Sequence, residues 1–154
     1  MTKISLEVIE LEWSGPFSIN WDKNEKFYTL SDIPAQLQNT AGIYQVYGRH
    51  PVYGANVLLY IGKTEQSFGD RLMEHFKNRF WFHSDLSVRL TTNSIDSVNI
   101  ENVESILIAA HKPALNRDHI DTAKDSAKGI LVRNLEFFGS LQSECSGDYW
   151  TQKI

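Results

Sequence analysis

Cysteine is nearly absent from this chain, because Cys145 is the only one among its 154 residues. A small secreted domain would normally carry paired cysteines, and a structural zinc site made of thiolates would need several. The sequence therefore excludes a thiolate-rich zinc site and argues for a reducing compartment. We expect Cys145 to be a packing or surface residue.

Long apolar runs are also missing. No stretch approaches the roughly 20 apolar residues that cross a bilayer, and the first residues, MTKISLEVIELEW, lack the apolar core of a signal peptide. The composition, 42% hydrophobic and 22% charged residues, is typical of a globular protein. We therefore expect a single domain, residues 1–154, that is cytoplasmic and has no membrane partner.

An excess of positive charge is the third absence. The chain has 15 Lys and Arg against 19 Asp and Glu, a net charge of −4, whereas free-standing nucleic-acid binders are usually basic. The distribution is uneven: residues 42–89 sum to +2, while residues 1–41 and 90–154 each sum to −3. Because local potential steers an anion more than the total charge does, the middle segment is where a polyanion would bind.

Several segments have the composition of β-strands. The stretches 42–48 (GIYQVYG) and 56–62 (NVLLYIG) are rich in β-branched and aromatic residues and are joined by a loop containing Pro51 and Gly54, which predicts a hairpin. Three further segments are predicted to be strands on their apolar pattern: 4–13, 86–92 and 129–138.

The hairpin has a plausible register in which Tyr44 pairs with Tyr60, so that the numbers of paired residues sum to 104. Directly opposed residues of an antiparallel pair project to the same face. The two tyrosines would then share one face, and Ile43 and Ile61 would point the other way, into a core. A bulge in the loop would break this register.

Three helices are predicted. Apolar residues recur at helical spacing in 67–80, where Arg71 and His75 are four residues apart and share a face. The segment 99–112 has a continuous apolar stripe, a capping asparagine at its start and a proline after its end. A short helix is expected in 31–40, with a proline in its first turn.

The order of the motifs resembles that of the GIY-YIG nuclease superfamily. The chain has GIY at 42–44, YIG at 60–62 followed by Lys-Thr, an arginine helix beginning GDRLMEH, a glutamate within VESILI, and KPALN ending at Asn116. One triplet alone is a weak signal, whereas the complete order is specific. The resemblance covers about residues 41–118, roughly half of the chain.

This resemblance implies an α+β fold, with a small, mainly antiparallel three-stranded sheet flanked by helices. Residues 41–118 would be the catalytic core, and residues 1–40 and 119–154 would be extensions, each too short for a core of its own. The resemblance also implies metal-dependent cleavage of DNA phosphodiester bonds.

Glu104 is the metal ligand that the resemblance implies. Mg²⁺, or Mn²⁺ in its place, prefers oxygen ligands and keeps several waters, so one protein carboxylate can suffice. The alternative interpretation is a solvent-facing glutamate on a helix. Glu101 lies one turn earlier, and we expect it to be exposed or to lie behind the ligand.

Tyr44 is the candidate general base. A free phenol has a pKa of about 10 and is a poor base at neutral pH, so a positive charge must lower that pKa. Lys63 could supply this charge, as could the metal through a shared water. Tyr60 would orient the water or the phosphate, and the two tyrosines could exchange these roles. The alternative is that both are cross-strand packing residues.

Three further positions complete the candidate site. Arg71 fits a phosphate clamp, since its planar guanidinium can grip two phosphate oxygens; the alternative is a surface salt bridge with Glu74. His75 could hydrogen-bond a tyrosine hydroxyl or a phosphate oxygen, or be a helix-face histidine paired with a neighbour. We expect Asn116 to fix the backbone of the hairpin by side-chain hydrogen bonds, the alternative being a plain turn residue.

The remaining candidates receive structural interpretations. The aromatic run 80–82 could stack on unpaired bases, but such a run more often belongs to a core. Three histidines have no evident chemical partner and are expected to be structural or exposed: His50, His83 and His111.

The sequence therefore predicts a metal-dependent DNA endonuclease. No DNA-binding module is visible in 1–40 or 119–154, which disfavours a homing-type enzyme and leaves a compact restriction-like homodimer or a stand-alone nuclease. The alternative is a non-catalytic module that binds nucleic acid or protein through the same hairpin, and the acidic net charge is its main support.

Overall fold

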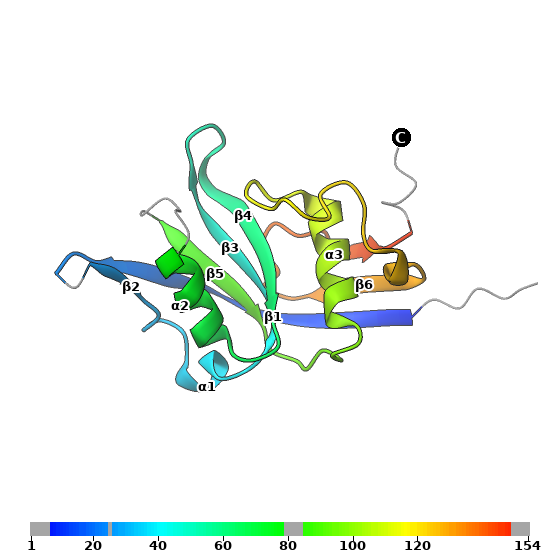
Figure 1. The fold of residues 1–154 in the computed structure, drawn as a ribbon, viewed down its shortest axis with the longest axis horizontal. Helices are drawn as coiled ribbons and strands as arrows, with labels where there is room; N and C mark the ends of the chain where they lie inside the picture. The colour runs from blue at the N-terminus through cyan, green and yellow to red at the C-terminus, as the bar shows by residue number, and fades with distance from the viewer. Residues whose placement is uncertain (1–6, 25, 79–84, 149–154) are drawn as a thin grey trace, which may run out of the picture.

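The computed structural model describes residues 7–24, 26–78 and 85–148. These residues form one continuous mixed β-sheet with three α-helices and a 3₁₀ turn (Figure 1). The elements in chain order are β1 (Glu7–Asp22), β2 (Phe27–Thr29), α1 (Ala35–Gln38), β3 (Gly42–His50), β4 (Gly54–Thr64), α2 (Phe68–Asn78), β5 (Leu86–Thr91), α3 (Ile100–His111), η1 (Asp125–Ala127), β6 (Ile130–Leu135) and β7 (Glu144–Ser146).

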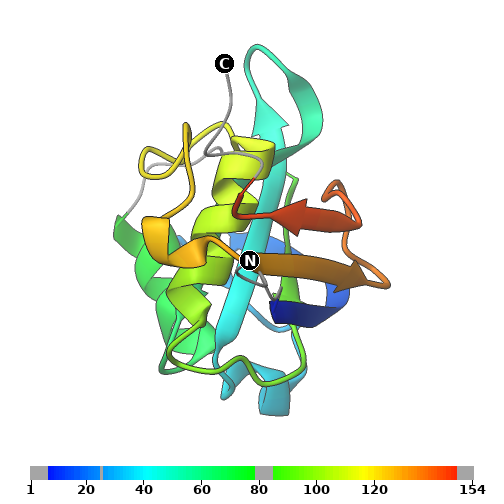
Figure 2. The same cartoon turned by 90° about the vertical axis from the view of Figure 1, so that its right-hand side faces the viewer.

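The sheet has seven strands in the order β4-β3-β5-β1-β6-β7, with β2 paired to β1. Every pairing is antiparallel except that of β1 with β6. Figures 1 and 2 show that the sheet curls strongly, so that β6 and β7 turn away from the β3–β4 hairpin. The prediction of a small three-stranded sheet flanked by helices is therefore wrong.

The strand β1 explains this error. Its first part pairs with β6, from Glu7 to Glu12, and its later part pairs with β5, from Trp13 to Ile19. A register shift between Ser14 and Phe17 lets the strand continue past a Gly-Pro pair, as a bulge permits. Residues expected to be extensions thus supply four strands of the same sheet: β1, β2, β6 and β7.

The two main helices cover opposite faces of the sheet. Helix α3 packs Val103 and Ile106 into a buried cluster with Ile43 and Ile61. Helix α2 contributes three residues to a second cluster, which also contains Tyr44, Val46 and Val88; these three are Phe68, Leu72 and Phe76. Burial of each such side chain stabilises the fold by about 1.5–3 kcal/mol relative to exposure.

The β3–β4 hairpin is present, but its register differs from the prediction. Tyr44 pairs with Gly62 and Val46 with Tyr60, so the paired numbers sum to 106 along most of the hairpin. Two bulges bring the sum back to 104 at the tip, where His50 pairs with Gly54. In the body of the hairpin the shift is an even number of residues, so it leaves Tyr44 and Tyr60 on one face and Ile43 and Ile61 on the other.

The faces of the hairpin follow the alternation of the sequence. Ile43 and Ile61 belong to the cluster under α3, and Tyr44 belongs to the cluster under α2. A Cβ atom at Gly62 would lie 2.4 Å from the Tyr44 Cζ atom. The glycine of YIG therefore makes room for the phenol ring of GIY.

Most of the other predicted elements are confirmed with shifted bounds. The structure has the predicted helices α1, α2 and α3 and the strands β5 and β6, while β2 and β7 were not predicted. Cys145 is a buried core residue, and burial raises the pKa of its thiol to about 12. The run 80–82 and His83 lie outside the described residues. None of the described helices combines the length and apolarity needed to span a bilayer.

Candidate active site

The predicted site residues gather around β4, which is the edge strand of the sheet. Tyr44, Tyr60 and His75 lie on the face covered by α2, as their ring contacts show. Glu104 comes from α3 on the other face. Because no strand continues the sheet beyond β4 within the described residues, groups from the two faces can meet around its edge.

Tyr44 is fully buried, with its ring centroid 6.2 Å from that of Tyr60 and edge-on to that of His75 at 6.0 Å. The Arg71 guanidinium approaches the phenol, yet the hydroxyl closes no hydrogen bond of normal geometry within the described residues. Burial raises the pKa of Tyr44 well above its usual value, and the neighbouring Tyr60 raises it further, whereas Arg71 lowers it. The phenol is therefore held in its protonated form.

Tyr60 and His75 complete this aromatic group. The His75 ring stands edge-on to Tyr60, with 4.7 Å between centroids and 81° between planes. His75 itself is buried, while Tyr60 is only partly buried and lines a cavity. Of the two tyrosines, Tyr60 is the one that faces open space.

Arg71 forms the salt bridge with Glu74 that was the alternative interpretation, and its role as a phosphate clamp stays a prediction. Its Nη1 atom lies 3.3 Å from Glu74 Oε1, in a side chain that is 38% exposed. The same guanidinium lowers the pKa of both Tyr44 and Glu104 by its positive charge. It therefore lies where a cation from α2 can act on groups from both faces of the sheet.

Glu104 is partly buried and lines a cavity of about 240 Å³. Burial raises the pKa of its carboxyl to about 7, against the positive charges of Lys63 and Arg71, which lower it. Asp118 and Glu101 add negative charge that raises this pKa further. An additional positive charge in the cavity would favour the ionised carboxylate.

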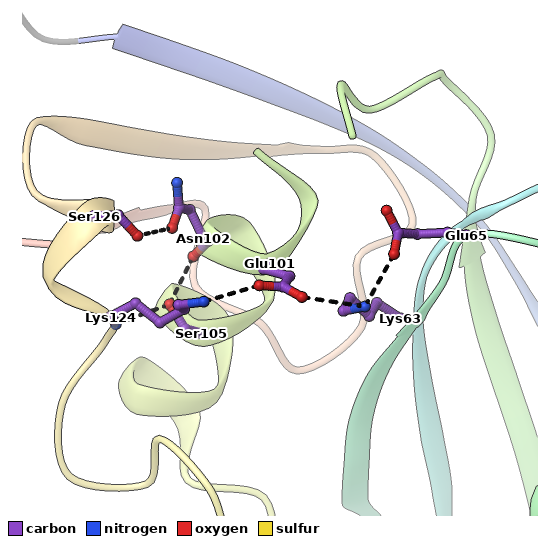
Figure 3. Close-up of polar contacts among 7 residues, drawn as sticks. All are labelled: Lys63, Glu65, Glu101, Asn102, Ser105, Lys124 and Ser126. Carbon is purple, nitrogen blue, oxygen red and sulfur yellow. Dashed lines mark hydrogen bonds and ion pairs between the residues drawn. The ribbon is translucent and has the colours of Figure 1, made fainter. Parts of the chain in front are cut away.

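Lys63 does not act on Tyr44 as predicted. It pairs with Ile43 across the hairpin and so points to the α3 face. Its Nζ atom lies 3.5 Å from Glu65 and 3.8 Å from Glu101 (Figure 3), and its charge lowers the pKa of Glu104. The cation that approaches Tyr44 is instead Arg71.

Glu101 is exposed, as expected, and connects Lys63 to the C-terminal part of the chain. Lys124 Nζ lies 2.8 Å from Glu101 Oε2 (Figure 3). Asn102, the next residue of α3, accepts a hydrogen bond at its Oδ1 atom from Ser126 Oγ at 2.6 Å. The first turns of α3 are therefore tied to the segment around η1.

Asn116 clamps the outer edge of β4. Its Oδ1 atom accepts the Ile61 N–H at 2.9 Å, and its Nδ2 atom donates to the Ile61 carbonyl at 3.0 Å. The backbone N–H groups of Ala114 and Leu115 donate to Leu58 and Leu59 at 3.3 and 2.8 Å. This is the hairpin-fixing role expected for Asn116, since its side chain satisfies an edge peptide as a further strand would.

Three residues directly after this clamp were not identified from the sequence. Arg117, Asp118 and His119 line the same cavity as Glu104 and Tyr60. Arg117 is exposed and makes no hydrogen bond or ion pair within the described part of the chain. His119 has a left-handed backbone, with a φ of 63°. Their only sequence signal is a run of three ionisable residues after KPALN.

The donor set suits a cation that needs few protein ligands. Among the described residues there is no group of three or more histidine, cysteine or acidic side chains that could hold a metal ion. Glu104 is the half-buried carboxylate of the cavity lining, which also contains the exposed Asp118 and the phenol of Tyr60. Mg²⁺ and Mn²⁺ fit such a site because they retain bound waters.

Comparisons with known proteins identify no relative of the chain. No protein-family model matches it, and no curated protein or solved structure matches it significantly. The functional argument therefore rests on the residues and the geometry of the β4 edge.

Proposed function

We propose that this protein is a metal-dependent DNA endonuclease that hydrolyses phosphodiester bonds at the β4 edge. The observation that carries the proposal is Glu104. Burial raises the pKa of this carboxyl to about 7, and it lies in a cavity that it shares with Tyr60. Two cations, Lys63 and Arg71, act on it from the two faces of the sheet. Such an arrangement binds a divalent cation and a phosphate together.

Each residue has a distinct task in this proposal. Glu104 would hold Mg²⁺ or Mn²⁺, which when bound polarises the phosphate and acidifies a water. Arg71 binds the non-bridging phosphate oxygens, since its guanidinium keeps its charge at any relevant pH. Lys63 lowers the pKa of Glu104 and so favours its ionised form, and Arg117 at the rim of the cavity contacts a flanking phosphate.

The tyrosines divide their tasks by burial. Tyr60 lines the cavity and orients the attacking water. Tyr44, whose pKa burial raises, is a poor base and acts as a positioning residue that supports Tyr60 and Arg71. His75 fixes the Tyr60 ring through its edge-on contact.

A plasmid cleavage assay tests the proposal. Supercoiled DNA is incubated with Mg²⁺ or Mn²⁺ and the wild type, Glu104→Gln or Glu101→Gln. Glu101 is the matched control because it lies one turn earlier on α3 and is exposed. We expect cleavage by the wild type and by Glu101→Gln and none by Glu104→Gln. Cleavage that persists in Glu104→Gln would contradict the ligand assignment.

A thermal shift gives a second reading that does not depend on activity. A cation that binds only the folded protein raises its melting temperature with concentration. We expect Mg²⁺ or Mn²⁺ to stabilise the wild type and Glu101→Gln but not Glu104→Gln. If all three proteins are inert and unshifted with either metal, while the wild type still binds DNA, the non-catalytic binding module is the better description.

Two further parts of the proposal concern context. We propose that the enzyme acts in the cytoplasm, as the single cysteine suggests. We also propose that it cuts both DNA strands as a homodimer. Sedimentation of the Glu104→Gln protein with and without DNA tests this, and a monomer under both conditions would refute it.

A further inference from the structure

A second, larger cavity, here called the groove, adjoins the proposed active site. It has a volume of about 630 Å³ and lies between the tip of the β3–β4 hairpin and the segment after α3, with His50, Tyr53, His111 and Lys112 in its lining. Asn116 lines both this groove and the Glu104 cavity. Figures 1 and 2 show the hairpin tip projecting beyond the rest of the sheet.

The hairpin tip presents an ordered aromatic pair to this groove. His50 Nδ1 accepts the backbone N–H groups of Val52 and Tyr53 at 3.1 and 3.3 Å. The imidazole ring stacks on the Tyr53 ring, with 4.6 Å between centroids and 26° between planes. Tyr53 nevertheless remains 69% exposed. The Tyr53 ring is therefore held in a fixed orientation by His50, and most of its surface is accessible to a ligand.

The groove differs from the Glu104 cavity in charge. Lys112 Nζ is engaged by the carbonyls of Ala109 and Ile120. Burial lowers the pKa of His111, whose two ring nitrogens contact the Leu107 carbonyl and the Gln142 N–H. The same lining contains the acidic Asp121, whose charge opposes that of Lys112 and disfavours phosphate binding in this groove.

We propose that the groove binds an unpaired nucleobase, stacked on Tyr53, while the adjoining phosphodiester lies in the Glu104 cavity. The inference rests on the proposed function and names its substrate class. The exposed aromatic ring of Tyr53 suits a base, and the cations around Glu104 suit its phosphate. A base can stack on a protein ring only when it has left the duplex stack. The substrate is therefore DNA with an unpaired nucleotide beside the scissile bond.

Cleavage of labelled oligonucleotides tests this inference. The substrates are a continuous duplex, a single strand, and a duplex with a short unpaired segment. We expect the two substrates with unpaired nucleotides to be cut at least tenfold faster than the duplex. Tyr53→Ala should raise KM for them by about 5- to 150-fold, the effect of losing one base–ring stack, whereas Tyr53→Phe should keep the wild-type KM.

Val52→Ala is the matched control at the same turn, since Val52 is 78% exposed and is not among the described residues that line the groove. It should behave as the wild type. Equal cutting of continuous duplex, or an unchanged KM in Tyr53→Ala, would overturn the inference while leaving the nuclease proposal intact.

A binding measurement separates the two proposals if no cleavage is seen. The probe is an oligonucleotide with 2-aminopurine in its unpaired segment, whose fluorescence falls when the base stacks. Quenching by the wild type, retained in Tyr53→Phe and lost in Tyr53→Ala, supports the groove even for an inert protein. No quenching, or equal quenching by all three proteins, would overturn it.

Discussion

Replacing Tyr44 with phenylalanine separates a catalytic hydroxyl from a structural one. The Tyr44 side chain is fully buried, and its hydroxyl closes no hydrogen bond of normal geometry within the described residues. Phenylalanine keeps the ring that lies against Gly62 and packs edge-on to Phe68. The substitution therefore removes one polar atom and little else.

The magnitude follows from the missing partner. Burying a hydroxyl without a hydrogen bond costs about 1–3 kcal/mol, which the approach of Arg71 partly offsets. We expect Tyr44→Phe to be between equally stable and about 2 kcal/mol more stable than the wild type. For a chain of this size the melting temperature should then rise by up to about 6 °C. The rate of DNA cleavage should fall sharply, because the Tyr44 hydroxyl, which interacts with Tyr60 and Arg71, is lost.

Tyr47→Phe is the matched control on the same strand. Tyr47 is also buried, but its hydroxyl donates to Gln45 Oε1 and accepts the Ser140 N–H at 2.9 Å. Removing it leaves both partners unpaired, so we expect a loss of about 1–3 kcal/mol. Urea denaturation of both variants measures the stabilities, and plasmid cleavage measures the activity. If Tyr44→Phe lowers the free energy of unfolding by more than about 1 kcal/mol and the variant still cleaves DNA at the wild-type rate, the reasoning is refuted and Tyr44 is a packing residue.

Three further predictions concern the loop after α3 and the end of that helix. Asn116→Asp should cost about 1–3 kcal/mol by urea denaturation, because a carboxylate cannot donate to the Ile61 carbonyl; equal stability would contradict the clamp. Arg117→Ala should lower the slope of log affinity for DNA against log salt by about 1, and an unchanged slope would exclude the phosphate contact. Burial lowers the pKa of His111 below its usual 6.5, so the unfolded chain takes up the proton first. The neutral, buried His111 therefore contributes its full share of the free energy of unfolding above pH 6.5. This contribution is lost as the pH falls through the lower pKa of the folded state. The loss should be absent in His111→Gln, and an identical pH profile would show that other groups cause it.

The local elements of this chain could be predicted because their signals are local. The alternation of GIYQVYG and NVLLYIG correctly separates Ile43 and Ile61 from Tyr44. The apolar stripe of 99–112 correctly predicts α3. The register of the hairpin could not be derived, since two bulges move the pairing by two residues between the tip and the body.

The sheet as a whole could not be predicted, because its order depends on contacts between distant segments. The parallel pairing of β1 with β6 joins residues more than 120 positions apart, such as Glu7 and Ile130. Nothing in either segment marks the other as its partner. The Gly-Pro pair within β1 also resembles a turn, and only the bulge opposite β5 lets the strand pass through it.

The candidate site was predicted where residues follow helical spacing and missed where they lie in irregular loops. Arg71 and His75 share a helix face as expected. Arg71 lowers the pKa of Tyr44, and the His75 ring contacts the Tyr44 ring edge-on. Lys63 was expected as one possible source of the charge near Tyr44, but it pairs with Ile43 and so lies on the face of Ile43 and Ile61. Arg117 follows no periodic pattern, and it reaches the cavity only because the clamp after α3 places it there.

The C-terminal segment supports the position of Glu104. Helix α3 packs one side on the sheet, and contacts from residues after 119 hold its N-terminal turns. These include the ion pair of Lys124 with Glu101 and the hydrogen bond from the Lys124 N–H to Ser105 Oγ at 3.1 Å, which flank Glu104 in the sequence (Figure 3). At the other end of the helix, Gln142 donates to His111 at 2.8 Å. The candidate site is therefore formed by residues 41–118, which contain the motifs, and is supported by residues after 119, which contain none of them.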